Sequence, residues 1–205
     1  MSANPKILEK IYTVEEYFEL EKHSKVRHEY YYGKLIEMAG ETKNANDIAN
    51  NILELIRKPF KKKGYRVFTH DVKAKVKTRG IYRYPDLMVA PNTDDSDDYV
   101  VLQPIIIVEV ASEDSLRTDS GLKFKEYTAL ASMQHYLVVS QDEMMVRLHT
   151  RDGEKWITQI LTEPEEAIHF TLFDMTLTLG DIYEDIVFAD SQSDRGANQN
   201  FAQNM

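Results

Sequence analysis

Apolar residues recur at helical spacing in three segments of the chain. The first follows Thr13, which forms a capping-box pattern with Glu16, so "VEEYFELEK" is predicted to be a helix. The second spans residues 44–63, where Pro59 is expected to end or kink the helix. The third spans residues 119–131. The pattern therefore predicts three helices, separated by shorter apolar runs.

Those shorter runs, bounded by turn residues, predict strands. "RHEYYYGKLIEMAG" predicts a hairpin that turns at Gly33, and "MMVRLHTRDGEKWITQIL" predicts another that turns at Asp152-Gly153. Further strands are predicted at "YRVFT", "VKAKVKT", "YPDLMVA", "PIIIVEVAS" and "HYLVVS". The run around Glu109 is apolar without alternation, so its strand should be central and covered on both faces. This order predicts an α/β (α+β) domain with a mixed central sheet flanked by helices.

Length and composition suggest one domain, expected over residues 1–188, with a polar, Asn- and Gln-rich tail at 189–205 that should be disordered. No apolar run approaches the roughly 20 residues that span a bilayer, and the N-terminus lacks the apolar core of a signal peptide. We therefore expect a cytoplasmic protein with no membrane partner. The absence of cysteine removes disulfides, thiolate catalysis and cysteine-bound zinc, and the histidines lack a short metal-ligand spacing.

The charge is unevenly distributed along the chain. The net charge of -9 argues against indiscriminate coating of nucleic acid, yet Arg57 to Arg83 contains eleven Lys or Arg and one acid, Asp71. This segment is either a solvated helix end and strand face or a phosphate-binding surface. The second interpretation predicts nucleic-acid contacts from Lys61, Lys62, Lys73, Lys75, Lys77, Arg79 and Arg83.

Two of the predicted strands each contain one carboxylate. Alternation places Asp86 on the strand face of Met88, and Glu109 on the strand face of Ile107 and Ala111. A buried carboxylate without a partner is costly or becomes neutral. If the strands pair antiparallel, both acids can reach one point and, with a backbone carbonyl and waters, could hold Mg²⁺ or Mn²⁺. Alternatively, either acid could accept hydrogen bonds from backbone amides at a strand end.

Lys123 lies four residues after Asp119 and four before Tyr127, so the three residues share one helix face. A lysine beside an attacking water could position or deprotonate it and stabilise charge on a phosphate. The alternative is an exposed Asp119–Lys123 ion pair that contributes little.

These residues carry a resemblance to a known family. Over roughly residues 12–187, from "YTVEEYFELE" through "YRYPDLMVA", "PIIIVEVAS" and "TDSGLKFKEY" to "LGDIYEDI", the chain resembles the Uma-two family of the PD-(D/E)XK restriction-endonuclease-like superfamily. Pro85-Asp86 matches the PD element and Glu109 the acid of (D/E)XK. In this family the lysine has migrated to the following helix, where Lys123 stands in the pattern D-x-x-x-K-x-x-x-Y, and Ala111 occupies the vacated strand position.

The resemblance implies a restriction-endonuclease-like fold and a Mg²⁺- or Mn²⁺-dependent DNA endonuclease that could act as a homodimer. Asp86, Glu109 and Lys123 would be catalytic. Glu37 would be an additional metal ligand beside Asp86 and Glu109. Asp119, Tyr127 and Ser112 would support the site.

The chain also departs from the family pattern. Ala45 stands where relatives commonly have histidine, and Ser120 where they often have arginine. These departures leave open a catalytically inactive module that binds DNA or protein. An enzyme with the same fold that acts on another phosphate ester is a third possibility.

Overall fold

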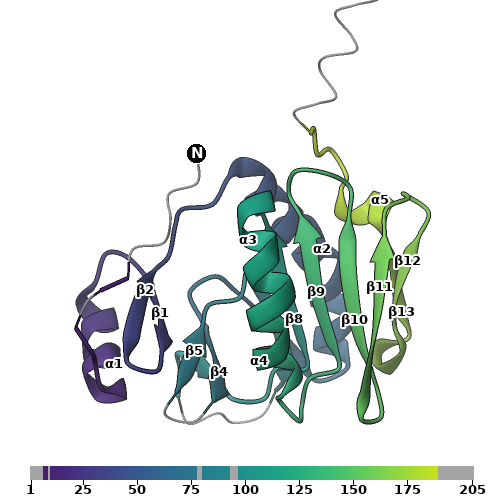
Figure 1. The fold of residues 1–205 in the computed structure, drawn as a ribbon. Helices are drawn as coiled ribbons and strands as arrows, with labels where there is room; N and C mark the ends of the chain where they lie inside the picture. The colour runs from purple at the N-terminus through teal and green to yellow at the C-terminus, as the bar shows by residue number, and fades with distance from the viewer. Residues whose placement is uncertain (1–6, 9, 78–79, 93–96, 189–205) are drawn as a thin grey trace, which may run out of the picture.

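The computed structural model describes residues 7–8, 10–77, 80–92 and 97–188. Arg79 and the predicted tail at 189–205 lie outside the described residues. Figure 1 shows helices on both sides of a large sheet, with a smaller sheet beside it that carries the N-terminal helix.

The helices follow the predicted pattern with one change in position. Helix α1 (Val14–His23) begins with the capping box of Thr13 and Glu16, and α2 (Lys43–Lys62) continues through Pro59 rather than ending there. The third helix begins at Glu113, earlier than predicted, and has α-helical ends on either side of a π-helical turn. Its parts are α3 (Glu113–Thr118), η1 (Asp119–Lys123) and α4 (Phe124–Thr128). A short 3₁₀ turn, η2 (Thr171–Phe173), and a short helix, α5 (Leu179–Ile182), were not predicted.

The large sheet has six strands in the order β11-β10-β9-β8-β6-β3. In chain order these are β3 (Tyr65–Thr69), β6 (Leu87–Pro91), β8 (Ile106–Ala111), β9 (His135–Ser140), β10 (Val146–Asp152) and β11 (Lys155–Leu161). Strand β8 pairs antiparallel with β6 and parallel with β9, so the sheet is mixed, as predicted.

A second sheet has five strands in the order β2-β1-β5-β4-β7. They are β1 (His28–Tyr31), β2 (Lys34–Glu37), β4 (Lys73–Lys77), β5 (Ile81–Arg83) and β7 (Val100–Val101). A separate hairpin joins β12 (Ala167–Phe170) and β13 (Met175–Thr178). The short strands β5 and β7 and this last hairpin were not predicted, because their apolar runs are brief.

Strand β8 lies at the centre of the core, as its apolar sequence predicted. Ile106 and Val108 pack in the cluster that contains Ile52 and Phe60 of α2. Ile107 packs in the opposite cluster, which contains Tyr127 of α4. The third helix therefore covers one face of the large sheet and α2 the other (Figure 1).

The predicted strand at 84–90 begins only at Leu87, and residues 84–86 link the two sheets. Arg83 ends β5 in the smaller sheet, Leu87 begins β6 in the larger one, and Asp86 lies in a bend between them. The prediction that Asp86 points from a regular strand face with Met88 was therefore wrong. Instead, the carboxylate lies where the chain passes from one sheet to the other.

A buried ion network joins the smaller sheet to the third helix. The guanidinium of Arg83, 2% exposed, donates from Nε and Nη2 to both carboxylate oxygens of Glu126 in α4, at 2.9 and 2.8 Å. Its Nη1 donates to Glu29 of β1 at 2.6 Å. Bidentate Arg–carboxylate pairs are strong and directional. This network fixes the position of α4 relative to β1 and β5.

Replacing Arg83 should therefore destabilise the fold. Arg83→Met leaves Glu29 and Glu126 buried without their cation, and the free energy of unfolding is expected to fall by about 3–5 kcal/mol in chemical denaturation. Adding Glu29→Gln and Glu126→Gln to this variant should recover part of the loss, because no unpaired charge remains. Arg57→Met, at an exposed position of α2, is the control and should change stability little. Equal losses from Arg83→Met and Arg57→Met would contradict the role of the network.

Candidate active site

Asp86 and Glu109 meet at one end of the β6–β8 pair. Leu87 lies opposite Val108, so the residue before Leu87 and the residue after Val108 reach the same end of the sheet. Oδ2 of Asp86 accepts a hydrogen bond of 2.6 Å from the backbone N–H of Val110. The Asp86 carboxylate thus lies against the peptide that follows Glu109.

The side chain of Lys123 enters this end of the sheet from the third helix. Its Nζ lies 2.9 Å from Oε2 of Glu109 and 2.9 Å from Oδ1 of Asp119. The hydroxyl of Tyr127 donates to the other oxygen of Glu109, Oε1, at 2.7 Å. Glu109 and Asp119 are each 4% exposed, and Tyr127 is fully buried. The exposed Asp119–Lys123 pair that the sequence left open is therefore excluded.

The π-helical turn explains how the helix presents these groups. Residues Asp119–Lys123 form the wide turn η1, a rare irregularity that occurs frequently at functional sites. Tyr136 of β9 fixes it by donating a hydrogen bond of 2.9 Å to the backbone carbonyl of Asp119. Ser112 has a more distant role: its side chain caps the start of α3 by accepting from the N–H of Ser115.

Burial makes the charges of the two acids costly. Desolvation raises the pKa of Asp86 to about 6, although the Val110 N–H and Lys123 oppose this shift. Desolvation, with repulsion from Asp119 and Asp86, raises the pKa of Glu109 to about 8 despite the attraction of Lys123. For Lys123, burial acts to lower the pKa, but the attraction of Glu109 and the other acids outweighs it and raises the pKa well above its usual value. Lys123 is therefore a cation at neutral pH.

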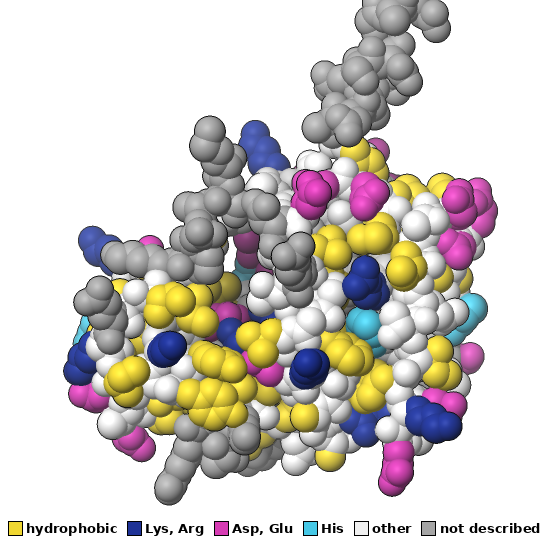
Figure 2. Space-filling model, in the orientation of Figure 1, with side chains coloured by type: hydrophobic (Ala, Val, Ile, Leu, Met, Phe, Trp, Pro, Cys, Tyr) yellow, Lys and Arg dark blue, Asp and Glu magenta, His cyan; other side chains and the backbone are white. Residues whose placement is uncertain are grey.

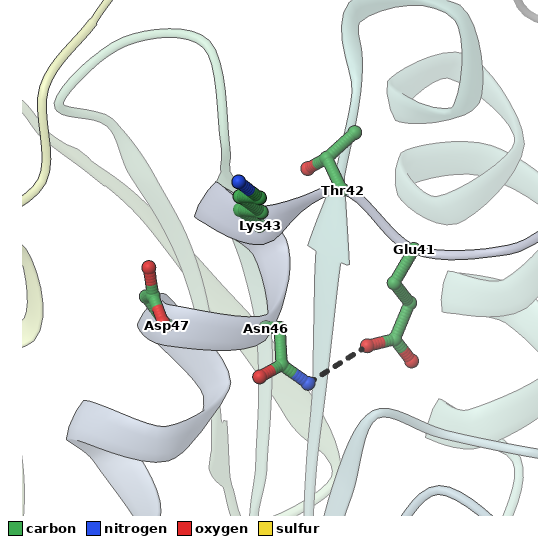
Figure 3. Close-up of a pocket in the computed structure, with 5 residues that line it drawn as sticks. All are labelled: Glu41, Thr42, Lys43, Asn46 and Asp47. Carbon is green, nitrogen blue, oxygen red and sulfur yellow. Dashed lines mark hydrogen bonds between the residues drawn. The ribbon is translucent and has the colours of Figure 1, made fainter.

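Glu41, in the loop before α2, is an additional acid near the site. It contributes to the raised pKa of Asp86 and contacts His70 Nε2 at 3.2 Å. Figure 3 shows Glu41 beside a pocket of about 320 Å³ at the start of α2, with Asn46 Nδ2 3.5 Å from its carboxylate. His70 has a left-handed backbone with φ of 56°, and its N–H donates to the Asp86 carbonyl at 3.4 Å. No sequence pattern identified Glu41 or His70, because each stands alone in a loop.

The remaining predicted ligand, Glu37, ends β2 in the smaller sheet, opposite His28. Its role as a metal ligand stays a prediction.

Two of the predicted phosphate contacts, Lys73 and Arg83, have buried side chains, which argues against contact with DNA. Arg83 is held by Glu29 and Glu126. Lys73 is 5% exposed, and its Nζ lies 5.0 Å from the ring centroid of Tyr84 and 5.3 Å from that of Phe18. Such cation–π contacts stabilise a desolvated ammonium. Both cations are therefore part of the fold rather than of a surface.

The other predicted contacts do not form one surface around Asp86. Lys61 and Lys62 are exposed at the end of α2, next to Gly64, whose carbonyl accepts from the Asn92 N–H. Asn92 follows the last residue of β6, whereas Asp86 precedes its first residue. The two lysines therefore lie near the opposite end of β6 from Asp86, and a strand of this length is about 17 Å long. Lys75 is half-buried on β4, and the side chain of Lys77 lies outside the described residues. Figure 2 shows a hollow between the α1–β1–β2 lobe and the third helix in which acidic and basic side chains are both visible.

The mixed sheet between helices, with two acids and a lysine at the end of its central strands, defines a protein of the restriction-endonuclease-like fold. A solved structure described as "a putative nuclease belonging to DUF820" from Anabaena variabilis superposes on this chain with a TM-score of 0.69 at 17% sequence identity. The match covers 85% of this chain and 99% of that one. At this identity the likeness establishes the fold alone.

Residues 14–180 match the sequence profile of the Uma2 family, described as "Putative restriction endonuclease". The chain therefore belongs to the Uma2 family, as its motifs predicted. Two relatives come from Synechocystis sp.. "Uncharacterized protein sll1609" is 28% identical, and the match covers 79% of this chain and 94% of the relative. "Uncharacterized protein slr1290" is 24% identical, and the match covers 85% of this chain and 92% of the relative. None of the helices in the described residues has the length and apolar character to cross a membrane.

The raised pKa of Asp86 gives a stability prediction with a defined sign. The pKa of Asp86 is about 6 in the folded chain and near 4 in the unfolded chain. Ionising the side chain therefore costs more in the folded state, and this cost to stability appears as the pH rises from about 4 through about 6. Asp86→Asn removes that cost and can still accept from the Val110 N–H. Without metal, the variant should melt no lower than the wild type at pH 8, and any advantage should disappear near pH 4. Thermal unfolding followed by circular dichroism measures this, with Asp47→Asn at an exposed position of α2 as control. A melting difference that does not change with pH would contradict the assignment.

Burial of Lys73 gives a second prediction. Lys73→Glu should lower the melting temperature, because it puts an anion among aromatic rings, and any loss of DNA binding should follow the loss of folded protein. Lys75→Glu, on the same strand but half-buried, should leave the fold intact and report on phosphate contacts alone. Folded Lys73→Glu protein with weakened, less salt-dependent DNA binding would restore the original interpretation of Lys73.

Proposed function

We propose that this Uma2 protein is a Mg²⁺- or Mn²⁺-dependent DNA endonuclease that uses Asp86, Glu109 and Lys123. The observation that carries the proposal is the convergence of these residues: Lys123 Nζ contacts Glu109 at 2.9 Å, and Asp86 Oδ2 lies 2.6 Å from the amide nitrogen that follows Glu109. Asp86 comes from the bend before β6, Glu109 from β8 and Lys123 from the third helix, so no single local segment accounts for the cluster. Membership of a family described as restriction endonucleases supports DNA as the substrate.

The donor chemistry of the site fits a hard divalent cation. Carboxylate oxygens suit Mg²⁺ and Mn²⁺, and the N–H of Val110 holds the Asp86 carboxylate in place through Oδ2 at 2.6 Å. No three His, Asp or Glu side chains in the described part of the chain are grouped to hold a metal ion. A cation here would therefore depend on Asp86 and Glu109, with main-chain oxygen and water completing its shell. When bound, it would activate water and neutralise charge on the phosphate.

The protein groups have separable roles in this proposal. Asp86 and Glu109 hold the cation, and their raised pKa values mean that a positive charge relieves the cost of ionising both. Lys123, a cation at neutral pH, can hold the scissile phosphate and stabilise its developing charge, but it cannot accept a proton in that state. Tyr127 and Asp119 orient Glu109 and Lys123 through the contacts described above.

Metal-dependent cleavage of plasmid DNA tests this function. Wild-type protein with Mn²⁺ should nick or linearise the plasmid, and Asp86→Asn, Glu109→Gln and Lys123→Met should each lower the rate by about a hundredfold or more. Lys125→Met changes an exposed lysine of the same helix and should retain activity. Cleavage that persists in Asp86→Asn would contradict the proposed site.

Metal binding can be measured without cleavage. A cation that binds only the folded chain stabilises it by about 2.7 kcal/mol at a hundredfold excess over its Kd. Millimolar Mn²⁺ or Mg²⁺ should therefore raise the melting temperature of the wild type, and much less that of Asp86→Asn. Equal shifts in the two proteins would show that Asp86 is not a ligand.

A second candidate, an inactive module that binds DNA or protein, is favoured by the departures at Ala45 and Ser120. Ala45 is buried in the first turn of α2, and the buried hydroxyl of Ser120 has no hydrogen-bond partner among the described residues. This candidate predicts binding of DNA or a partner protein with no cleavage under any metal. The plasmid assay, paired with a DNA-binding measurement, separates the two functions.

A further inference from the structure

Strand β11 is an open edge of the large sheet. It ends the strand order, and no second strand pairs with it among the described residues. Its middle residues are exposed on both faces of the sheet: Ile157 is 49% and Ile160 56% exposed, and Thr158 and Gln159 between them are also exposed, whereas Leu161 at the end of the strand is buried. An edge of this kind presents unpaired backbone N–H and C=O groups to solvent.

The strand lacks the features that protect isolated edges. Natural edge strands are shortened, bulged, or interrupted by proline or charge. Strand β11 has seven residues, pairs with β10 without a break in register, and contains no proline and no charged residue after Lys155. The opposite edge, β3, differs, because Tyr65, Val67 and Phe68 are all partly buried there. An exposed apolar edge of this length favours a partner strand.

The β-hairpin defines which backbone groups are free. The turn at Gly153, with φ of +61°, leaves Asp152 opposite Lys155, and the residues that close a two-residue turn are hydrogen-bonded to each other. Alternation then directs the N–H and C=O of Trp156, Thr158 and Ile160 away from β10.

We propose that β11 pairs antiparallel with β11 of a second copy of this chain, about a two-fold axis at Thr158. In this register Thr158 of one copy lies opposite Thr158 of the other. Trp156 of each copy lies opposite Ile160 of the other, so this second pair occurs twice. Threonine pairs and aromatic–β-branched pairs are both favourable across strands. Lys155 comes opposite Leu161, so no like charges face each other. The pattern is complementary to itself, which favours a second copy over an unrelated strand, and two sheets of six strands become one continuous sheet.

This inference is independent of the proposed nuclease activity. The pairing leaves the backbone of β8 and the third helix unchanged, so loss of the dimer and loss of the active site are separate observations. The contact uses one strand from each copy, so it is smaller than a standard interface, and the dimer should dissociate on dilution.

Sedimentation velocity over a dilution series tests the pairing. The wild type should shift from dimer to monomer on dilution, and Ile160→Lys should stay monomeric with an unchanged melting temperature, because residue 160 is exposed in the monomer. Leu172→Lys makes the same kind of change at an apolar residue that is 54% exposed in η2, and should dimerise as the wild type does. A wild type that is monomeric at every concentration, or an Ile160→Lys variant that still dimerises, overturns the proposal.

A cross-link tests the register. The chain has no cysteine, so a single introduced thiol can pair only with its copy. In the proposed dimer the Cα atoms of residue 158 lie about 5.5 Å apart, within the range of a disulfide. Thr158→Cys should form a covalent dimer on mild oxidation, whereas Thr176→Cys, at an exposed position of β13, should not. Absence of the Thr158 cross-link, or equal cross-linking of both variants, overturns the register.

Discussion

The site depends on one buried ammonium that is shared between two acids. Lys123 lies 2.9 Å from both Glu109 and Asp119, all three side chains being largely withdrawn from water. Breaking a buried ion pair by removing one partner leaves an uncompensated charge, so each group requires the others. Asp86 adds a third carboxylate at the same end of the sheet. The described protein groups supply more negative than positive charge here, which is the electrostatic setting that favours a divalent cation.

The rest of the fold places this cluster. Strands β6 and β8 bring the two acids to one end by their antiparallel register, and the π-helical turn brings Lys123 to the same point. Arg83 then joins α4 to the smaller sheet through Glu126 and Glu29. The helix that carries Lys123 is therefore held from both sides: by Tyr136 of the large sheet and by Arg83 of the small one. This rigidity is what a preorganised catalytic site needs.

Much of the architecture could be predicted from the sequence, because long periodic segments such as α2 and the uninterrupted apolar run of β8 have strong local patterns. The pairing of Asp86 with Glu109 also followed from strand spacing, and the helix position of Lys123 from the family motif. The failures have physical causes. A run of lysine and arginine does not reveal which cations are desolvated, so Lys73 and Arg83 were assigned to a surface. Short strands, the π-helical turn and the loop residue Glu41 depend on tertiary contacts that no local pattern records.

The most direct test of the central claim is the affinity of Lys123→Met for Mn²⁺, measured by calorimetry against the wild type. If Lys123 supplies the positive charge that holds Glu109 and Asp119, its removal leaves these two carboxylates and that of Asp86 without a protein cation. Mn²⁺ should then bind roughly tenfold more tightly or better, although cleavage is lost. Unchanged or weaker Mn²⁺ binding in a folded Lys123→Met protein would contradict the account.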